Sequence, residues 1–364
     1  MSPRPFRRDA GQLVFAGFAG PVVTPEIRAI AREYTLGGIV LFKRNVEEPA
    51  QVAELAYEIA QLQPDLPLWV AVDQEGGRVA RMRAPFTEWP PMLTLGRSGD
   101  PALAGRFARA LAAELAAVGV TLDFAPVLDV LTNPSNPVIG DRALAEDAER
   151  AAELGTVVIT ALQDAGIAAC GKHFPGHGDT SVDSHVELPL VEHPVEQLRA
   201  REFVPFRAAI AAGVASIMTG HVFMPALDEA VPATLSSRVV TGLLRRELGY
   251  DGLVFTDDLE MKAISAHHSV PGAAVQAVAA GCDAVLVCGT DHDVQAQAIE
   301  ALIHAVEDET IARTRIDEAL GHHRVARHRF LPAVPRRPRT ARELRALLGT
   351  GEHQVVADEM RRFA

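Results

Sequence analysis

Residues 146–180 have the sequence EDAERAAELGTVVITALQDAGIAACGKHFPGHGDT, and this stretch contains the pattern that decides the fold. Apolar residues recur at helical spacing over residues 146–165, and residues 168–174 form a short apolar run of strand length. A loop rich in glycine, histidine and charged residues follows at once. The stretch therefore predicts a helix that leads into a buried strand, with polar side chains where the strand ends.

The same alternation continues along most of the chain. Short apolar runs of strand length occupy residues 13–19, 38–42, 68–73, 121–127, 168–174, 215–221, 253–257 and 284–288. Segments with helical spacing lie near residues 24–33, 49–62, 101–118, 146–165, 194–212, 236–247, 271–280 and 292–306. Eight strands and eight helices are the number found in a (β/α)8 barrel of the TIM type. We therefore predict an α/β fold of this kind over residues 1–330.

An open doubly wound sheet is the alternative fold, because it uses the same alternation. Two features favour the barrel. No Gly-x-Gly-x-x-Gly fingerprint follows the first predicted strand, and polar residues follow many strands instead of gathering at one switch point.

Residues 331–364 differ from the rest of the chain. They begin with Leu331-Pro332-Ala333-Val334-Pro335, a composition typical of a linker, and two short helices are predicted at residues 341–348 and 354–363. We interpret this segment as a short C-terminal extension. It is either a helical tail packed on the barrel or the remnant of a lead-in to a second domain.

The composition argues against several classes of protein. With 48% hydrophobic residues the chain can form a large core, and its net charge of -12 argues against binding nucleic acid. No run approaches the roughly 20 apolar residues that span a bilayer. The cysteines, Cys170, Cys282 and Cys288, lie in apolar runs and are odd in number, which suits a reducing compartment. We expect a cytoplasmic protein without a membrane, nucleic-acid or obligatory protein partner.

Charged and polar side chains follow many of the predicted strands. They are found in Asp73-Gln74-Glu75-Gly76-Gly77-Arg78, at Asp123 and Asp129, from Lys172 to Thr180, in Thr219-Gly220-His221 and in Thr256-Asp257-Asp258. The carboxyl ends of barrel strands carry the active site, and charges are costly to desolvate there without a use. Each carboxylate alone could be a cap or half of an ion pair. Together these residues predict a site for a polar ligand.

Asp183 and His185 follow the longest of these runs, within Ser-Val-Asp-Ser-His. On extended backbone, side chains two residues apart point to the same face, so the carboxylate can fix the tautomer of the imidazole. A pair of this kind is a candidate general acid/base. The alternative is an ordinary Asp–His contact in a surface loop.

Three motifs give the chain a resemblance to a known family. The run from Asp73 to Val79, the run from Lys172 to Thr180 with Asp183-Ser184-His185, and Thr256-Asp257-Asp258-Leu259 occur in the order found in family 3 glycoside hydrolases. Over residues 10–325 the chain resembles the β-N-acetylglucosaminidase (β-N-acetylhexosaminidase) branch, whose best-known bacterial members recycle cell-wall muropeptides. The resemblance implies a (β/α)8 barrel, often distorted from ideal geometry. It also implies a retaining glycosidase that removes terminal, non-reducing, β-linked N-acetylglucosamine from a carbohydrate.

The resemblance also implies roles for individual residues. Asp257 matches the nucleophile, and Asp183 with His185 matches an acid/base dyad on a flexible loop. The positions that hydrogen-bond the hydroxyls of the non-reducing sugar are matched by Asp73, Arg81, Arg142, Lys172 and His173. No metal or other cofactor is expected. No role is implied for Asp258, Glu75 or Asp129, which we expect to be caps or ion pairs.

A metal-dependent hydrolase on the same barrel is the first functional alternative. The residues with suitable ligand atoms are His173, His177, His185, His221 and Asp257. Against this alternative, no His-Glu-x-x-His motif occurs, and nearby cationic side chains would crowd a metal ion.

Two further alternatives keep a sugar as ligand. A non-catalytic sugar-binding protein would need neither Asp257 nor the Asp183–His185 pair. A glycoside phosphorylase stays open, because a neutral imidazole would not repel an incoming phosphate. If His185 is not the acid/base, His177 is the next candidate.

Overall fold

Parallel strands form the centre of the molecule. The computed structural model describes residues 4–63, 65–184, 187–332, 334 and 336–364. The strands close a barrel in the order β1-β10-β9-β8-β7-β6-β3-β2, and every neighbouring pair is parallel. They are β1 (Val14–Ala16), β2 (Gly38–Leu41), β3 (Trp69–Val72), β6 (Leu122–Asp123), β7 (Ala168–Phe174), β8 (Ser216–Thr219), β9 (Leu253–Asp258) and β10 (Ala284–Val287). Each overlaps one predicted run, so the predicted (β/α)8 barrel is confirmed.

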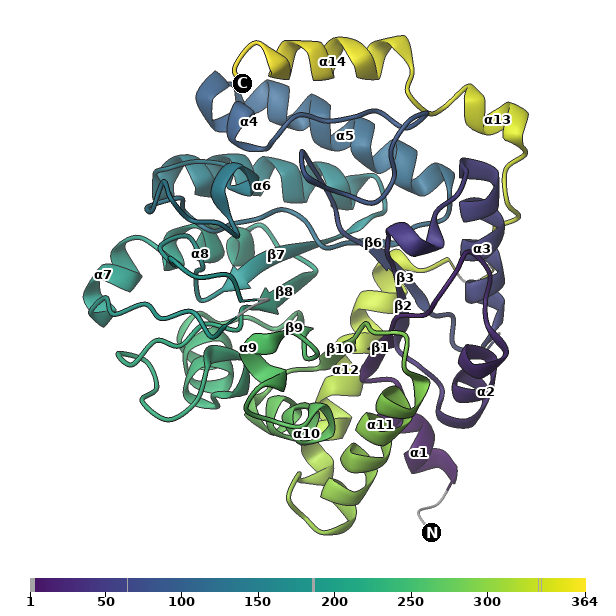
Figure 1. Cartoon of the computed structure of the whole chain (residues 1–364), viewed down its shortest axis with the longest axis vertical. Coiled ribbons are helices and arrows are strands. Elements are labelled where there is room, and N and C mark those ends of the chain that lie inside the picture. Colours follow the sequence, from purple (N-terminus) through teal and green to yellow (C-terminus); the bar gives the residue numbers. More distant parts are fainter. Residues whose placement is uncertain (1–3, 64, 185–186, 333, 335) are drawn as a thin grey trace.

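Helices surround the barrel and cover its outer face (Figure 1). The helices predicted between strands are α2 (Pro25–Tyr34), α3 (Pro49–Gln61), α5 (Pro101–Ala117), α6 (Ala148–Asp164), α7 (Val195–Ala200) with α8 (Phe203–Ala211), the π-helix η4 (Arg238–Glu247), α10 (Val270–Ala280) and α11 (His292–Glu307). Shorter elements are α1 (Arg4–Gly11), α4 (Leu93–Ser98), α9 (Lys262–Ser265), η1 (Lys43–Asn45), η2 (Gly140–Arg142) and η3 (Ala233–Leu235). Thr24 and Asp100 cap α2 and α5 by accepting hydrogen bonds from amides of the first turn. None of the helices in the described part of the chain is both long and apolar enough to cross a membrane.

Apolar side chains fill the barrel. Phe255 of β9 makes edge-to-face contacts with Phe15 of β1 and with Phe124, at centroid distances of 4.9 and 5.5 Å. All three rings are buried, as is Trp69 of β3. Because the interior is packed with side chains, the active site of such a barrel lies beyond the carboxyl ends of the strands.

A long helix that the sequence pattern did not predict covers the amino ends of the strands. This helix, α12 (Arg313–Phe330), lies behind β1 and β10 in the view of Figure 1. Phe330 lies beside Trp69, the first residue of β3, and His323 stacks on Phe15 at 6.2 Å between centroids. His323 Nε2 also lies 3.0 Å from the backbone oxygen of Asp283. The helix closes this end of the barrel and leaves the carboxyl ends of the strands for function.

The C-terminal segment contains two helices that pack on the outside of the barrel. They are α13 (Ala341–Arg345), which contacts α3, and α14 (Gly351–Arg361), which lies along α5 and α4 (Figure 1). The Arg106 guanidinium of α5 makes hydrogen bonds of 2.8 and 2.9 Å to the Glu359 carboxylate of α14. The buried Glu114 carboxylate of α5 accepts a hydrogen bond from His353 Nδ1 at 2.7 Å. Side chains at both ends of α14 therefore hold it to the barrel.

A small hairpin extends the barrel at its carboxyl end. It consists of the antiparallel strands β4 (Gln74–Gly76) and β5 (Val79–Ala80), which directly follow β3. Gly76, the last residue of β4, and Gly77, the first of the turn, have positive φ angles of 109° and 54°, a conformation that residues with a Cβ rarely adopt. The hairpin was not predicted, and it contributes to the site described next.

Candidate functional site

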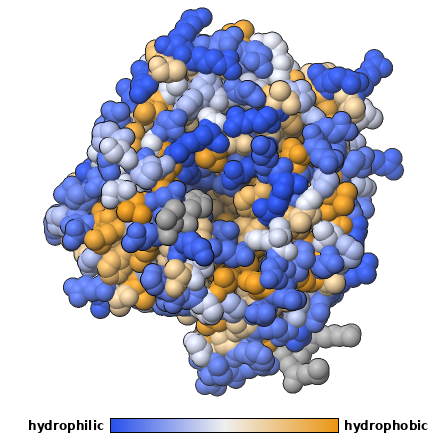
Figure 2. Space-filling model, in the orientation of Figure 1, coloured by the Kyte–Doolittle hydropathy of each residue, from blue (hydrophilic) through white to orange (hydrophobic). Residues whose placement is uncertain are grey.

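Charged side chains gather beyond the carboxyl ends of the barrel strands. Asp73 follows β3, Lys172 and His173 lie near the end of β7, and Asp257 lies near the end of β9. Figure 2 shows the molecule in the orientation of Figure 1, with a hollow near the middle of this face and many hydrophilic side chains around it. The polar residues predicted at separate strand ends therefore meet at one end of the barrel.

Five charged side chains form one connected network. Lys172 Nζ lies 2.8 Å from Asp73 Oδ1 and 2.6 Å from Glu75 Oε1. Arg142 makes a bidentate pair with Glu75 at 2.8 and 2.9 Å. Arg81 Nη2 lies 3.0 Å from the second oxygen of Asp73. The structure thus brings together four of the residues predicted to bind the sugar, with Glu75 as an additional member.

The carboxyls of this network are ionised at neutral pH. Burial alone would raise the pKa of Asp73, but Lys172 and Arg81 hold it well below its usual range. Burial would also raise the pKa of Glu75, but Arg142 and Lys172 lower it to about 2. Two carboxylates and three cations leave an excess of N–H donors, which suits hydrogen bonding to the hydroxyls of a sugar.

Glu75 is the member of the network to which the sequence analysis gave no ligand-binding role. The ion pair expected for it is present, and its side chain is 1% exposed between Arg142 and Lys172. One signal in the sequence could have placed it here. Asp73 and Glu75 are two residues apart on extended backbone, so their side chains share a face.

Asp129 anchors both histidines of the loop after β7. Its Oδ2 accepts hydrogen bonds from His173 Nδ1 at 2.7 Å and from His173 N at 3.2 Å. Its Oδ1 accepts one from His177 N at 2.6 Å. Burial raises the pKa of Asp129, but its interactions with His173 and His177 outweigh burial and lower it. A carboxylate at Nδ1 assigns the ring proton of His173 to that nitrogen and leaves Nε2 for a ligand.

Asp257 is half-buried, and its environment favours the ionised form. Its Oδ1 accepts a hydrogen bond from the backbone amide of Asp258 at 2.8 Å. Burial would raise the pKa of Asp257, but its electrostatic interactions with His173 and His221 and the amide hydrogen bond keep it below its usual value. A carboxylate that is ionised at neutral pH can act as a nucleophile.

The pKa of Asp258, the next residue, is shifted in the opposite direction. Burial raises its pKa to about 7, although its Oδ1 accepts hydrogen bonds from Glu260 N and Cys288 N, each at 3.2 Å. The negative charges of Glu260 and Asp257 act in the same direction as burial. Asp258 is therefore protonated at mildly acidic pH, and Asp257 is the carboxylate of this pair that suits nucleophilic attack.

The predicted acid/base pair is described in part. Asp183 is half-buried, and its backbone oxygen accepts a hydrogen bond from Glu187 N at 2.9 Å. His185, its predicted partner, lies outside the described residues. The acid/base role of the two residues stays a prediction.

Three of the four histidines named for a metal site, His173, His177 and His221, are described, and each has a protein partner. His177 Nδ1 lies 2.6 Å from Thr180 Oγ1, and His221 Nδ1 lies 2.9 Å from Thr234 Oγ1. Within the described ranges, no three His, Cys, Asp or Glu side chains are arranged to hold a metal ion.

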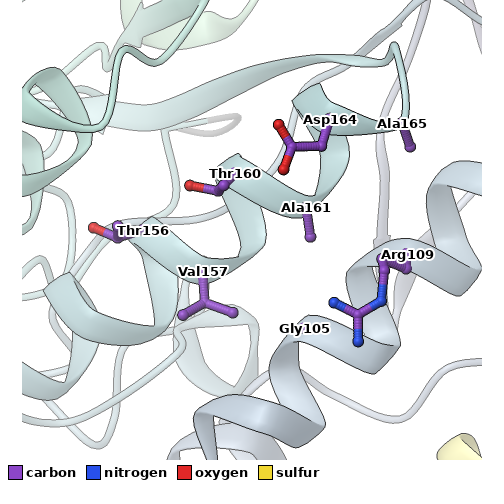
Figure 3. Close-up of a pocket in the computed structure, with 8 residues that line it drawn as sticks. All are labelled: Gly105, Arg109, Thr156, Val157, Thr160, Ala161, Asp164 and Ala165. Atoms are coloured by element: carbon purple, nitrogen blue, oxygen red, sulfur yellow. The ribbon is translucent and has the colours of Figure 1, made fainter.

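A second hollow lies on the outside of the barrel, between α5 and α6 (Figure 3). It has a volume of about 430 Å³. The lining consists of small, apolar and hydroxyl side chains with one arginine and one aspartate: Gly105, Arg109, Thr156, Val157, Thr160, Ala161, Asp164 and Ala165. None of the residues predicted for catalysis or sugar binding is among them, so the barrel mouth is the candidate active site.

Comparisons with known proteins agree on one family. Residues 7–327 match the model described as the glycosyl hydrolase family 3 N terminal domain. A β-hexosaminidase from Thiobacillus denitrificans is 39% identical over 346 residues, which are 93% of this chain and 94% of that protein. A β-hexosaminidase from Nitrosomonas eutropha is 44% identical over 276 residues, covering 74% of this chain and 78% of the relative.

Two solved structures are similar over nearly the whole chain. A family 3 β-N-acetylglucosaminidase from a Paenibacillus species superposes with a TM-score of 0.91 at 43% identity, covering 98% of this chain and 68% of that one. NagZ from Neisseria gonorrhoeae superposes with a TM-score of 0.79 at 33% identity, covering 97% of both chains.

Proposed function

The chain belongs to glycosyl hydrolase family 3 and is a glycosidase of the β-hexosaminidase type, and we propose that it removes terminal β-linked N-acetylglucosamine with retention of configuration. The observation that carries the proposal is the ionised Asp257 carboxylate at the barrel mouth, which interacts electrostatically with Lys172 of the buried charged network. A nucleophilic carboxylate close to donors for sugar hydroxyls is what a retaining glycosidase requires.

In the first step, an oxygen of Asp257 attacks the anomeric carbon. The glycosidic C–O bond breaks, and the departing oxygen takes a proton from His185. The sugar is then esterified to Asp257. In the second step, water attacks the anomeric carbon, His185 takes a proton from that water, and the bond to Asp257 breaks. Two inversions at one carbon leave the product with the configuration of the substrate.

A histidine suits this alternation because its pKa lies near neutrality, so it can both donate and accept a proton at physiological pH. Asp183 has the role of orienting and stabilising the imidazolium. This assignment follows from the spacing of the two residues and from the family resemblance.

The charged network has the role of binding the non-reducing sugar. Lys172, Arg81 and Arg142 supply donors, and Asp73 supplies an acceptor that is already ionised. Because these groups are held by one another, they do not need to reorganise when charge develops on the sugar. His173, oriented by Asp129, adds Nε2 as a further contact.

We propose that the natural substrates are muropeptides or related cell-wall or chitin fragments, processed in the cytoplasm during peptidoglycan recycling. The support is the resemblance to the branch whose bacterial members recycle muropeptides. Cys170, Cys282 and Cys288 are buried and free, which is compatible with a reducing compartment.

Covalent labelling tests the assignment of Asp257. A 5-fluoro-N-acetylglucosamine donor should add one sugar to the peptide that contains Asp257, and NMR should show the β-anomer as the first product. Asp258→Asn serves as the matched control, because it changes the adjacent carboxyl and should still be labelled. Label on another carboxylate, or an α-anomer as first product, would contradict the mechanism.

Turnover with and without phosphate tests the acceptor in the second step. A hydrolase releases free N-acetylglucosamine at the same rate in both conditions. Accumulation of the sugar 1-phosphate would instead identify a phosphorylase that uses the same residues.

A further inference from the structure

The loop that follows β7 is fixed at its beginning. Asn136 Nδ2 donates hydrogen bonds to the backbone oxygens of His177 and Gly178 at 2.8 and 3.0 Å, and to Thr180 Oγ1 at 3.2 Å. Asp129 Oδ1 accepts a hydrogen bond from His177 N at 2.6 Å. Residues 177–180 are therefore held by partners from the segment that connects β6 with α6.

The hydrogen bonds of His177 assign the position of its ring proton. Thr180 Oγ1 lies 3.0 Å from the backbone oxygen of His177, which can only accept, so the hydroxyl hydrogen is used there. The same hydroxyl oxygen then accepts from His177 Nδ1, 2.6 Å away, and Nδ1 carries the proton. Nε2 is left as an acceptor for the Ser184 hydroxyl at 3.3 Å. Burial lowers the pKa of His177 to about 4, so the neutral ring required here is present at neutral pH.

Ser184 connects two parts of the barrel rim. Ser184 is 2% exposed, and its backbone oxygen accepts a hydrogen bond from Ala263 N at 3.1 Å. Ala263 belongs to α9, which follows β9 and Asp257. The residue before Ser184 is Asp183. Ser184 therefore links the Asp183 segment to the loop after β7 and also to the helix after the proposed nucleophile.

We propose that His177 and Ser184 form a positioning pair that fixes the Asp183 segment relative to Asp257 and thereby makes acid catalysis efficient. This inference rests on the proposed function, in which Asp183 belongs to the acid/base pair. His177 is 1% exposed and both of its ring nitrogens are engaged, so it cannot exchange protons with a substrate. It is a positioning residue and not the acid/base itself.

Dependence on the leaving group tests the pair. Ser184→Ala removes one buried hydroxyl, and Ser181→Ala makes the same chemical change at an exposed position of the same loop. We measure kcat/KM with a nitrophenyl glycoside, whose leaving group departs without a proton, and with an N-acetylglucosamine disaccharide, whose leaving alcohol needs one. Ser184→Ala should lose about tenfold on the disaccharide, as expected for one lost hydrogen bond to a positioned group, and little on the nitrophenyl substrate. Ser181→Ala should match the wild type on both.

A role in folding alone would give a different result. It would lower the amount of active enzyme and reduce both rates by the same factor, leaving their ratio unchanged. An unchanged ratio in Ser184→Ala overturns the inference, whether the rates fall together or not at all.

A double-mutant cycle tests whether the two residues act together. If they form a pair, His177→Leu should change the same ratio, and adding Ser184→Ala to it should cause no further change. Effects that multiply would show separate roles and overturn the pairing. If His177→Leu does not fold, the comparison of Ser184→Ala with Ser181→Ala decides alone. A wild-type protein that cleaves neither substrate overturns the proposed function, whereas turnover with an unchanged ratio overturns only this inference.

Discussion

Burial and the neighbouring negative charges shift the pKa of Lys172 in opposite directions. Its side chain is 2% exposed, and burial would lower its pKa, but Asp73 and Glu75 keep the pKa above its usual value. Arg81 binds the same Asp73 carboxylate from a more accessible position, with 26% of its side chain exposed. Both cations pair with Asp73 but differ in burial. Substituting each of them can therefore distinguish a role in sugar binding from a role in stability.

Lys172→Ala and Arg81→Ala should therefore differ in stability more than in activity. Each loss of a preorganised donor should cost about 2–4 kcal/mol in kcat/KM. Only Lys172→Ala removes a buried cation that Asp73 and Glu75 share, which should lower the free energy of unfolding by about 3–5 kcal/mol. Steady-state kinetics and urea unfolding check the two parts. Near-normal kinetics in both variants would mean that the sugar binds elsewhere.

His185→Ala should separate the two steps of the reaction. On a nitrophenyl glycoside the leaving group needs no proton, so the intermediate should form and then accumulate, giving a burst and a low KM. On a disaccharide the same variant should lose several orders of magnitude, because the leaving alcohol is basic. Asp183→Ala should show the same pattern in milder form. Equal slowing on both substrates without a burst would remove His185 from the acid/base role.

The grouping of charged side chains at the barrel mouth could be predicted from the sequence where the residues lie at strand ends. Asp73, Lys172 and Asp257 are adjacent in space because the carboxyl ends of barrel strands meet on one face. The partners of Glu75 and Asp129 could not be predicted in this way. Arg142 is 67 residues from Glu75, and His173 is 44 residues from Asp129, so no local spacing indicates either contact.

At the scale of elements, strands were easier to predict than the helix that closes the barrel. The buried positions of α12 include Ile316, Ala319 and Phe330 at helical spacing, but also His323 and Arg327. His323 and Arg327 are buried because they hydrogen-bond backbone oxygens of Asp283 and Gly37, at 3.0 and 3.3 Å. Polar residues on the inner face hide the apolar stripe on which a sequence-based assignment depends.

The two side-chain anchors of α14 should contribute unequally to stability. The Glu114 side chain is 2% exposed, and its carboxylate accepts hydrogen bonds from Thr87 N, Thr87 Oγ1, Gly349 N and His353 Nδ1. Glu359 pairs with Arg106 at the surface, where solvent screens the charges. Glu114→Gln should lower the free energy of unfolding by about 2–3 kcal/mol. The N–H donors of the new amide would face the buried N–H and O–H donors that now bond the carboxylate. Glu359→Gln, the matched control, should change the free energy of unfolding little. Equal losses in urea unfolding would contradict this, because they would show that the buried carboxylate contributes no more than the surface pair.

At the scale of the whole molecule, buried ionisable groups at both ends of the barrel have shifted pKa values. Burial lowers the pKa of His177 at the carboxyl end and of His323 at the amino end to about 4. Burial raises the pKa of Asp123 and Asp258 to about 7. The histidines therefore make stability rise between pH 4 and 6.5, since only the unfolded chain is protonated there. The aspartates make it fall over nearly the same range, since only the folded chain is protonated.

These opposing contributions predict a plateau of stability between about pH 4 and 6.5. Each group contributes a slope of about 1.4 kcal/mol per pH unit, two of each sign, so the slopes cancel. Below this range stability should fall, because the folded pKa values of Glu75 and Asp283 are about 2, and the stabilisation that these groups give is lost as pH falls from their unfolded pKa values towards 2. The double variant Asp123→Asn/Asp258→Asn should remove the descending slope, so that its stability rises with pH across the former plateau. Thermal unfolding of both proteins from pH 3 to 8 measures this. A plateau that persists in the double variant would show that these two aspartates do not cause the descending slope.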